Sequence, residues 1–149
     1  MNDATETIHE RFEEDHGQLH ALLGRIDWAR PEEARAAFEA FALRLDRHIA
    51  WEEEVLFPVS LRALPGLDRR AVAALEEEHL RLRARLARTR EALRAGDPAA
   101  GALGRELAAA LAVHGAEEER TLYPACDARL PPAEQRRVLD VIRAGENGV

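Results

Sequence analysis

The chain lacks several residue types that mark particular classes of protein. It contains no lysine, so arginine supplies all 21 basic side chains against 28 acidic ones, and the net charge is −7. This acidic balance argues against nucleic acid or an anionic membrane surface as a partner. The single cysteine, Cys126, excludes both a disulfide framework and a zinc cluster built on thiolates.

Long apolar runs are also missing. No stretch of about 20 apolar residues is present, so we expect no membrane span. The first six residues are mostly polar or acidic, which is not the pattern of a secretory signal. Together with the single cysteine, this indicates a reducing compartment, and we expect a cytoplasmic protein that forms one domain over residues 1–149.

Strand-forming residues are scarce, whereas helix formers dominate. Val, Ile and Thr together number 15, while Ala, Leu, Glu and Arg are the commonest residues. Proline and glycine residues divide the chain into helical segments. We expect helices over residues of about 4–28, 31–63, 69–95, 98–129 and 132–144.

These helices have recognisable ends and irregularities. Asp68 and Asp97 stand where the third and fourth helices need an N-cap. Pro58 and Pro124 fall inside the second and fourth helices, where each should cause a kink or a local break. Short connections make consecutive helices antiparallel neighbours. The predicted fold is all-α: an up-down-up-down four-helix bundle with a short fifth helix at the C-terminus.

The chain also contains an internal repeat. Residues 48–58 align with residues 114–124, and both segments contain the pattern His-x-x-x-Glu. A second alignment places His16 and its neighbours on His79 and its neighbours. We therefore expect the two helix pairs to be related by a pseudo-two-fold axis.

Each long helix carries one His on its apolar stripe, and the second and fourth helices add a Glu one turn later. A lone His on an apolar face is usually a hydrogen-bonded core residue. Buried carboxylates without a basic residue on the stripes, however, need another partner. A nitrogen and oxygen set of this size suits two metal ions bridged by carboxylates, with iron or manganese favoured and zinc acceptable. The predicted ligands are His16, His48, Glu52, His79, His114 and Glu118.

A ferritin-like arrangement is an alternative interpretation of the same helices. The Glu-x-x-His pattern of ferritin-like bundles occurs at Glu13 and again at Glu76. Such bundles need a long crossover between their second and third helices, whereas about five residues separate these segments here. This alternative also leaves the His of each His-x-x-x-Glu motif without a role.

Three further side chains lie close to the predicted ligands in the sequence. His20 follows His16 by four residues, so it is either a fifth metal ligand or a residue that supports the centre from outside. Tyr123 and Phe57 each lie nine residues beyond a ligand His, about 180° around an α-helix, and should therefore pack outward.

The remaining polar and aromatic residues have structural interpretations. We expect His9 at the rim of the centre, Trp51 in the core, and Cys126 as a structural thiol. The third helix has an Arg-rich face that is most simply a solvated, salt-bridged surface. Its members are Arg81, Arg83, Arg85, Arg88, Arg90 and Arg94.

The ordered set His, His-x-x-x-Glu, His, His-x-x-x-Glu resembles the hemerythrin-like cation-binding (HHE) family over about residues 8–130. The resemblance extends to the aromatic residue and proline that follow each His-x-x-x-Glu motif. It implies a four-helix bundle with a non-haem di-iron centre, in which two Fe ions share an oxo or hydroxo bridge. The ligands it implies are His16 and His48 for one iron, His79 and His114 for the other, and Glu52 and Glu118 as bridges.

The chain differs from the oxygen-carrying members of that family at two positions. Those proteins have an additional His in the third helix, where this chain has Arg83. Their last carboxylate is an Asp five residues after the His, where this chain has Glu118 at four. With two His per iron, each ion keeps an open position, which favours reaction with peroxide or nitric oxide over a long-lived oxygen adduct.

Three functions are compatible with such a centre. The first is a module that binds or senses O2, NO or H2O2, which would need a separate protein partner to pass on a signal. The second is an enzyme that degrades peroxide or nitric oxide at the di-iron centre. The third is iron storage or handling. The sequence assigns no catalytic residue beyond the metal centre.

Overall fold

The computed structural model describes residues 6–147, and every regular element among them is a helix, which confirms the all-α prediction. None of the helices in this part of the chain is both long enough and apolar enough for a transmembrane span. The elements in chain order are α1 (Ile8–Gly24), α2 (Pro31–Trp51), the π-helical turn η1 (Glu52–Leu56), α3 (Phe57–Ala63), α4 (Arg69–Ala95), α5 (Ala100–Arg120), α6 (Leu122–Arg129) and α7 (Pro132–Asn147).

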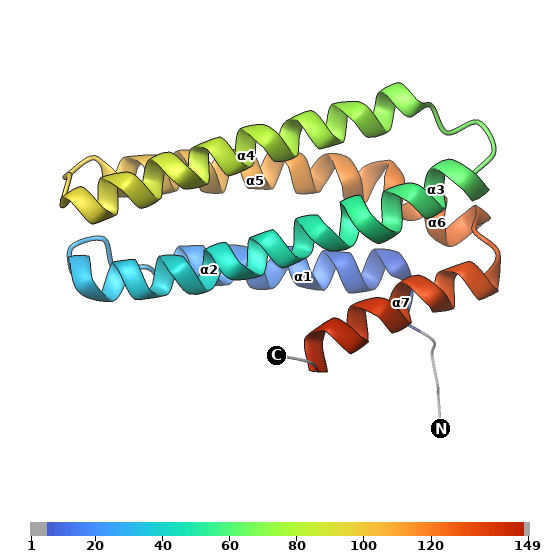
Figure 1. The fold of residues 1–149 in the computed structure, drawn as a ribbon, viewed down its shortest axis with the longest axis horizontal. Helices are drawn as coiled ribbons and strands as arrows, with labels where there is room; N and C mark the ends of the chain where they lie inside the picture. The colour runs from blue at the N-terminus through green and yellow to red at the C-terminus, as the bar shows by residue number, and fades with distance from the viewer. Residues whose placement is uncertain (1–5, 148–149) are drawn as a thin grey trace.

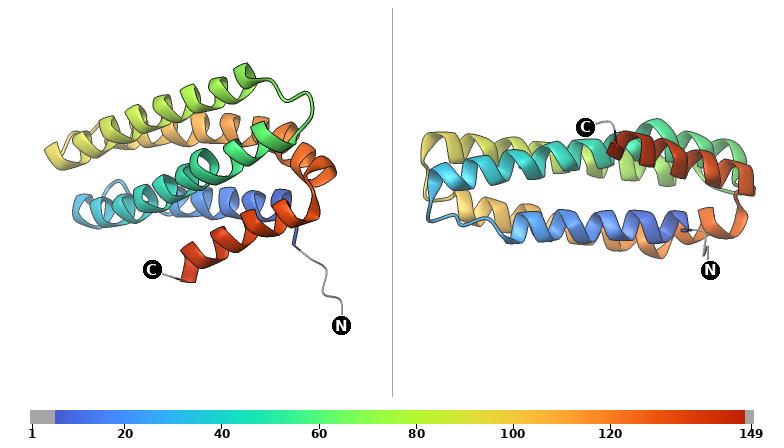
Figure 2. Two further views of the ribbon diagram at one scale, coloured as in Figure 1. Left: turned by 45° about the vertical axis from the view of Figure 1, so that its right-hand side comes forward. Right: turned by 90° about the horizontal axis from the view of Figure 1, so that it is seen from below.

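Four long helices lie side by side and form the bundle (Figure 1). Each of them contacts two others, in the order α1, α2, α4, α5 around the bundle (Figure 2). The α1–α2 and α4–α5 loops lie at one end of the molecule and the α3–α4 loop at the other, so consecutive helices are antiparallel. The fifth helix, α7, runs along the outside and contacts α1 and η1. The predicted bundle topology is therefore confirmed.

Capping and turn residues shorten the first helix relative to the prediction. The Thr7 hydroxyl accepts a hydrogen bond from the Glu10 backbone N–H, and the Glu10 carboxylate accepts one from the Thr7 N–H. This capping box starts α1 after Thr7 rather than near residue 4, which itself lies outside the described residues. The helix ends at Gly24 rather than near residue 28, because Asp27 accepts a hydrogen bond from the Ala29 N–H in a separate turn.

Of the two aspartates predicted as helix N-caps, Asp68 caps its helix and Asp97 does not. Asp68 accepts a hydrogen bond from the Arg70 N–H and caps α4, as predicted. Asp97 accepts one from the Ala99 N–H, which stabilises a turn over Pro98 instead of the first turn of the helix. As a result α5 begins two residues later than predicted.

Both predicted proline irregularities are present, in two forms. Before Pro58 the helix widens into η1, where the Phe57 N–H bonds to the carbonyl of Glu52. Before Pro124 the helix breaks at Thr121, whose hydroxyl and N–H both bond to the carbonyl of Glu117. A proline lacks an N–H and crowds the preceding turn, so the backbone there gives up the regular α-helical pattern. Side chains beyond each irregularity therefore face a direction that an uninterrupted helix would not give them.

Two apolar clusters fill the bundle, one on each side of a polar layer. One cluster includes Phe38, Leu45 and Leu107. The other includes Phe12 and Leu56 and is covered by apolar residues of α7. Along α1 and α4 the polar layer lies between residues of these two clusters, and along the fourth helix it lies between Leu111 of α5 and Leu122 of α6. The fold thus encloses a polar centre between apolar walls that separate it from water at both ends.

Candidate metal centre

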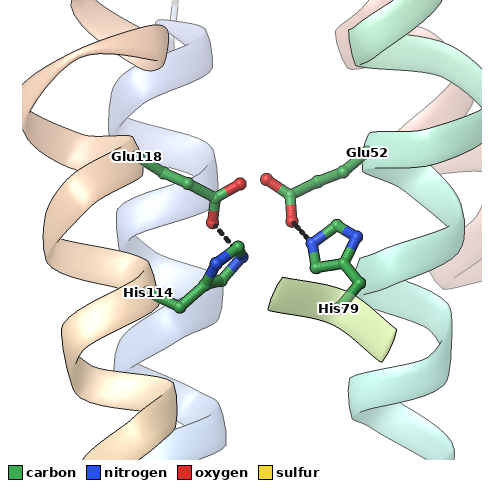
Figure 3. A group of neighbouring side chains, drawn as sticks. All are labelled: Glu52, His79, His114 and Glu118. Atoms are coloured by element: carbon green, nitrogen blue, oxygen red, sulfur yellow. Dashed lines mark hydrogen bonds and ion pairs between the residues drawn. The ribbon is translucent and has the colours of Figure 1, made fainter. Parts of the chain in front are cut away.

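All six predicted ligands converge in this polar layer. Glu52, His79 and Glu118 are fully buried, and the other three are at most 4% exposed. Figure 3 shows four of them: the two carboxylates approach each other across the bundle, with His79 and His114 beneath them. Each His comes from a different long helix, as the repeat predicted.

The ligand atoms form two groups, each compact enough for one metal ion. One group contains Glu52, His79, His114 and Glu118, and the other contains His16, His48 and Glu118. Glu118 belongs to both, so the two groups share a carboxylate. Among the described residues, no Asp and no Cys belongs to either group.

Each carboxylate also contacts one imidazole from either group. Oε1 of Glu52 lies 3.1 Å from Nε2 of His48 and 3.2 Å from Nε2 of His79. Oε1 of Glu118 lies 3.1 Å from Nε2 of His114 and 3.4 Å from Nε2 of His16. The two glutamates therefore occupy equivalent positions, each between the two halves of the centre.

A carboxylate orients every one of the four imidazoles from its outer side. Asp15 lies 2.6 Å from Nδ1 of His48, and Glu78 lies 2.5 Å from Nδ1 of His114. The same contact joins Glu119 to His16 at 2.9 Å and Glu53 to His79 at 3.0 Å. An imidazole whose Nδ1 carries the proton for such a contact presents the lone pair of Nε2 to the centre.

Sequence reasoning did not assign these four carboxylates, although a signal for them was present. Each is the immediate chain neighbour of a predicted ligand, and the repeat aligns Asp15 with Glu78 and Glu53 with Glu119. Neighbouring residues on a helix point about 100° apart, so each acid reaches the His of an adjacent helix and not that of its own. Only the packing of the helices makes these pairs.

The prediction that Tyr123 and Phe57 pack outward is wrong. The Tyr123 hydroxyl lies 2.8 Å from Glu52, 3.1 Å from Glu118 and 3.2 Å from Nε2 of His16. Phe57 stacks on the imidazole of His79, with ring centroids 5.6 Å apart. The wide turn before Phe57 and the break before Tyr123 rotate both side chains inward, which an uninterrupted helix would not do.

Burial and nearby charges strongly shift the pKa values of His48 and His114. Burial alone would lower the pKa of His48, but the carboxylates of Glu52 and Asp15 raise it to about 10. Burial likewise opposes the protonation of His114, but Glu118, Glu52 and Glu78 raise its pKa to about 9. Without a bound cation, protons on these two imidazoles balance part of the carboxylate charge.

The pKa values of the two central carboxyl groups are shifted in opposite directions. Burial raises the pKa of Glu118, and the neighbouring charge of Glu52 raises it further. For Glu52 the effect of burial is outweighed by the charge of His48 and by hydrogen bonds, so its pKa is lowered well below the usual range. Burial also raises the pKa of Tyr123 far above its ordinary value, so this phenol keeps its proton.

The donor set fits a metal centre on the evidence of its unsatisfied atoms. Nε2 of His114 and Oε2 of Glu118 are buried and make no hydrogen bond. Nε2 of His16 and Nε2 of His48 face each other at 3.2 Å. Buried polar atoms without a partner are costly, and cations placed between these nitrogens and oxygens would satisfy them together.

The structure also shows where the candidate fifth ligand, the ferritin-like candidates and Arg83 lie. His20 is half-buried and lies outside both ligand groups. Glu13 and Glu76, which the ferritin-like alternative requires as ligands, are exposed and outside both groups as well. Arg83, at the position of the additional His, pairs with Glu53 at 3.6 Å.

The structural interpretations agree with the packing. His9 lies at the rim, 3.6 Å from Glu13. Trp51 is buried in the apolar cluster that includes Phe12. Cys126 is buried 3.4 Å from the Ser60 hydroxyl, and burial raises the pKa of its thiol to about 11. The six arginines of the third helix are exposed or half-buried along α4.

Comparison with known proteins agrees with this geometry. The family described as "Hemerythrin HHE cation binding domain" matches residues 2–126. No curated protein and no solved structure matched the chain. The family match spans most of the sequence and includes all six residues of the buried centre. The chain therefore belongs to the hemerythrin HHE cation-binding domain family, and its His and Glu cluster is a candidate site for metal cations.

Proposed function

We propose that the centre holds two iron ions. His16 and His48 would bind one ion and His79 and His114 the other, while Glu52 and Glu118 bridge them. The observation that carries this proposal is the position of the two glutamates, since each lies within 3.4 Å of an imidazole from either half. A mixed imidazole and carboxylate set suits iron, with manganese or zinc as substitutes.

The ligand count indicates a centre that is open to small molecules. Two imidazoles and two bridging carboxylates leave an octahedral ion short of a full set, and His20 and Arg83 do not complete it. We propose O2, NO or peroxide as the class of ligand, with peroxide or NO as the one that reacts. Two bound iron ions would supply the electrons for that reaction.

Tyr123 supports reaction with a small ligand rather than iron storage. Its hydroxyl hydrogen points to Glu52 or Glu118, and the strongly raised pKa keeps this proton in place at neutral pH. It is thus a buried proton donor at the centre, which the two apolar clusters separate from water at both ends of the bundle. A positioned donor of this kind assists the cleavage of an oxygen–oxygen bond by supplying a proton to the leaving oxygen.

The proposal is tested by elemental analysis and absorption spectroscopy of protein grown with ample iron. We expect two iron ions per chain and a charge-transfer spectrum that changes when peroxide or NO is added. His20→Ala should leave both the spectrum and peroxide consumption unchanged, because His20 is outside the ligand groups. One zinc ion per chain and no iron would refute the di-iron proposal. A stable, reversible oxygen adduct that is lost in His20→Ala would indicate an oxygen carrier instead.

A further inference from the structure

A cavity of about 320 Å³ lies between α1 and α5 and has one of the six predicted ligands, His16, in its wall. These two helices are neighbours in the bundle (Figure 2). The cavity reaches His16, a predicted ligand that is otherwise buried. Its polar wall consists of Glu13, His20 and Glu119, of which Glu119 also contacts Nδ1 of His16. The cavity therefore joins solvent to a ligand through carboxylate and imidazole groups.

Two glycines keep this cavity open. A side chain at Gly115 would place its Cβ 3.0 Å from Nδ1 of His16, so glycine at this position avoids crowding that imidazole. At Gly17, on the opposite wall, an added Cβ would meet nothing within 4 Å, which means that the space beside it is empty. Ala112 and Ala116 complete the wall with small side chains.

The equivalent positions of the other half of the repeat carry larger side chains. Leu80 stands where the first half has Gly17, and Ile49 stands where α5 has Gly115. Arg83 replaces His20, and it pairs with Glu53 at 3.6 Å and with Asp46 at 4.0 Å. His79 is fully buried there, whereas His16 retains some exposure. The pseudo-symmetry of the ligands is therefore not repeated in the surface that covers them.

A second cavity, of about 610 Å³ between α4 and α5, reaches His114 but has a different charge. Arg81 and Arg85 contribute to its wall together with Glu78 and Glu106. The cavity beside His16 has no arginine in its wall and contains two carboxylates. A cation is attracted to a site of one negative sign and is repelled by guanidinium groups, so the charge distinguishes the two routes.

We infer that metal ions enter the centre through the cavity between α1 and α5, with Glu13, His20 and Glu119 as the first groups that bind them. Carboxylate oxygens and an imidazole nitrogen are ligands for the same divalent ions that the inner His and Glu residues would hold. Glu119 contacts both the cavity and His16, so it lies at the step between the outer groups and the centre. The inference rests on the proposed function in one respect only, namely that the centre takes up divalent metal.

The test is the rate at which metal-free protein takes up Co²⁺, followed by the absorption of the bound ion. Gly17 lies in the cavity wall and an added Cβ there meets nothing within 4 Å, so Gly17→Leu should narrow the cavity. We expect uptake at least about tenfold slower with the final Co²⁺ content unchanged. Gly24→Leu is the matched control, because Gly24 also lies in α1 and an added Cβ there meets nothing within 4 Å. This control should load at the wild-type rate.

Two further variants test the charge of the cavity between α1 and α5 and the alternative route through the cavity between α4 and α5. The double variant Glu13→Gln, His20→Gln should slow uptake by roughly three- to tenfold through lost attraction of the cation, and more at low than at high ionic strength. Ala110→Leu narrows the cavity between α4 and α5 and should have no effect on the rate.

Several outcomes would overturn the inference. Wild-type uptake in Gly17→Leu would do so, as would slow uptake in Ala110→Leu, which would assign entry to the other cavity. Loss of helical circular dichroism in the metal-free wild-type chain would also overturn it, because an unfolded chain needs no route. If wild-type protein bound no Co²⁺ at all, the proposed metal centre itself would fail, so the two failures are distinguishable.

Discussion

The two halves of the repeat hold the same ligands in different surroundings. In both halves the first helix contributes a His and the second helix a His and a Glu. The acid beside the first His and the acid beside the Glu each orient an imidazole across a helix interface. The residues around these side chains differ between the two halves. The α2 half surrounds its side of the centre with Arg44, Arg47 and Ile49, whereas α5 has Ala110, Val113 and Gly115 at the aligned positions.

A second difference lies just beyond the ligands. Phe57 and Tyr123 occupy aligned positions, but Phe57 stacks on His79 while Tyr123 brings a hydroxyl to both central carboxylates, Glu52 and Glu118. The comparison teaches that the repeat preserves what a metal site needs, namely nitrogen and oxygen donors with fixed orientation. The surroundings of these residues are not repeated, since a cavity reaches His16 whereas His79 is fully buried, and Tyr123 carries a hydroxyl that Phe57 lacks.

The largest expected effect follows from the symmetric part of the centre. Glu52→Ala and Glu118→Ala should each reduce the metal content from two ions to less than one per chain, because either carboxylate contacts both groups of imidazoles. Glu54→Ala and Glu117→Ala are matched controls outside both ligand groups and should retain two ions. Loss of a single ion in either variant, measured by elemental analysis, would show that the carboxylates do not bridge.

Removal of the metal should lower the melting temperature by roughly 5–10 °C, since a ligand that binds only the folded state stabilises it by mass action. The measurement is thermal unfolding of metal-loaded and metal-free protein at the same concentration. Equal melting temperatures would contradict a buried centre of six ligands.

The difference in melting temperature between metal-loaded and metal-free protein should depend on pH. In metal-free protein the pKa values of His48 and His114 are raised from 6.5 to about 10 and about 9, because carboxylates surround them. Raised pKa values contribute stability that is fully present below pH 6.5 and is lost as the pH rises through 9 and 10. Metal must displace these protons, so the difference in melting temperature should widen from pH 6.5 to pH 9. A difference that narrows with rising pH would contradict these shifts.

Gly115→Ala should affect only one half of the centre. Its Cβ would lie 3.0 Å from Nδ1 of His16, where it crowds the contact between His16 and Glu119. We expect about tenfold weaker binding of one metal ion and unchanged binding of the other, the size typical for disturbed support of a ligand. Gly17→Ala is the control, since an added Cβ meets nothing there. Equal weakening of both sites in a metal titration would show that the halves are coupled.

The smallest expected effect is that of removing the Tyr123 hydroxyl. Tyr123→Phe makes the two halves alike at this position and should cost about 1 kcal/mol of unfolding free energy through the lost hydrogen bond. Metal content should stay at two ions, while peroxide consumption falls. Unfolding in urea and peroxide assays measure the two effects separately. Unchanged peroxide consumption would remove Tyr123 from the proposed chemistry.

Most of the fold and the six convergent side chains were predictable because they depend on short-range patterns. Apolar residues at intervals of three and four, breakers such as Pro31 and caps such as Asp68 define helices through local backbone and side-chain chemistry. The His-x-x-x-Glu spacing places both side chains on one helix face whatever the helix packs against. The predicted boundaries were wrong at Thr7, where a capping box starts the helix later, and at Asp97, where a turn precedes the helix.

The sequence by itself determined that four helices would each present a His to a common interior, with two carboxylates added by the repeat. The tertiary structure decided which helices face each other, and with that the pairing of Asp15 with His48 and of Glu119 with His16. It also decided the direction of Tyr123, because the break before it changes the phase of the helix. Spacing along one helix fixes relative angles within that helix alone, whereas contacts between helices depend on how whole surfaces pack.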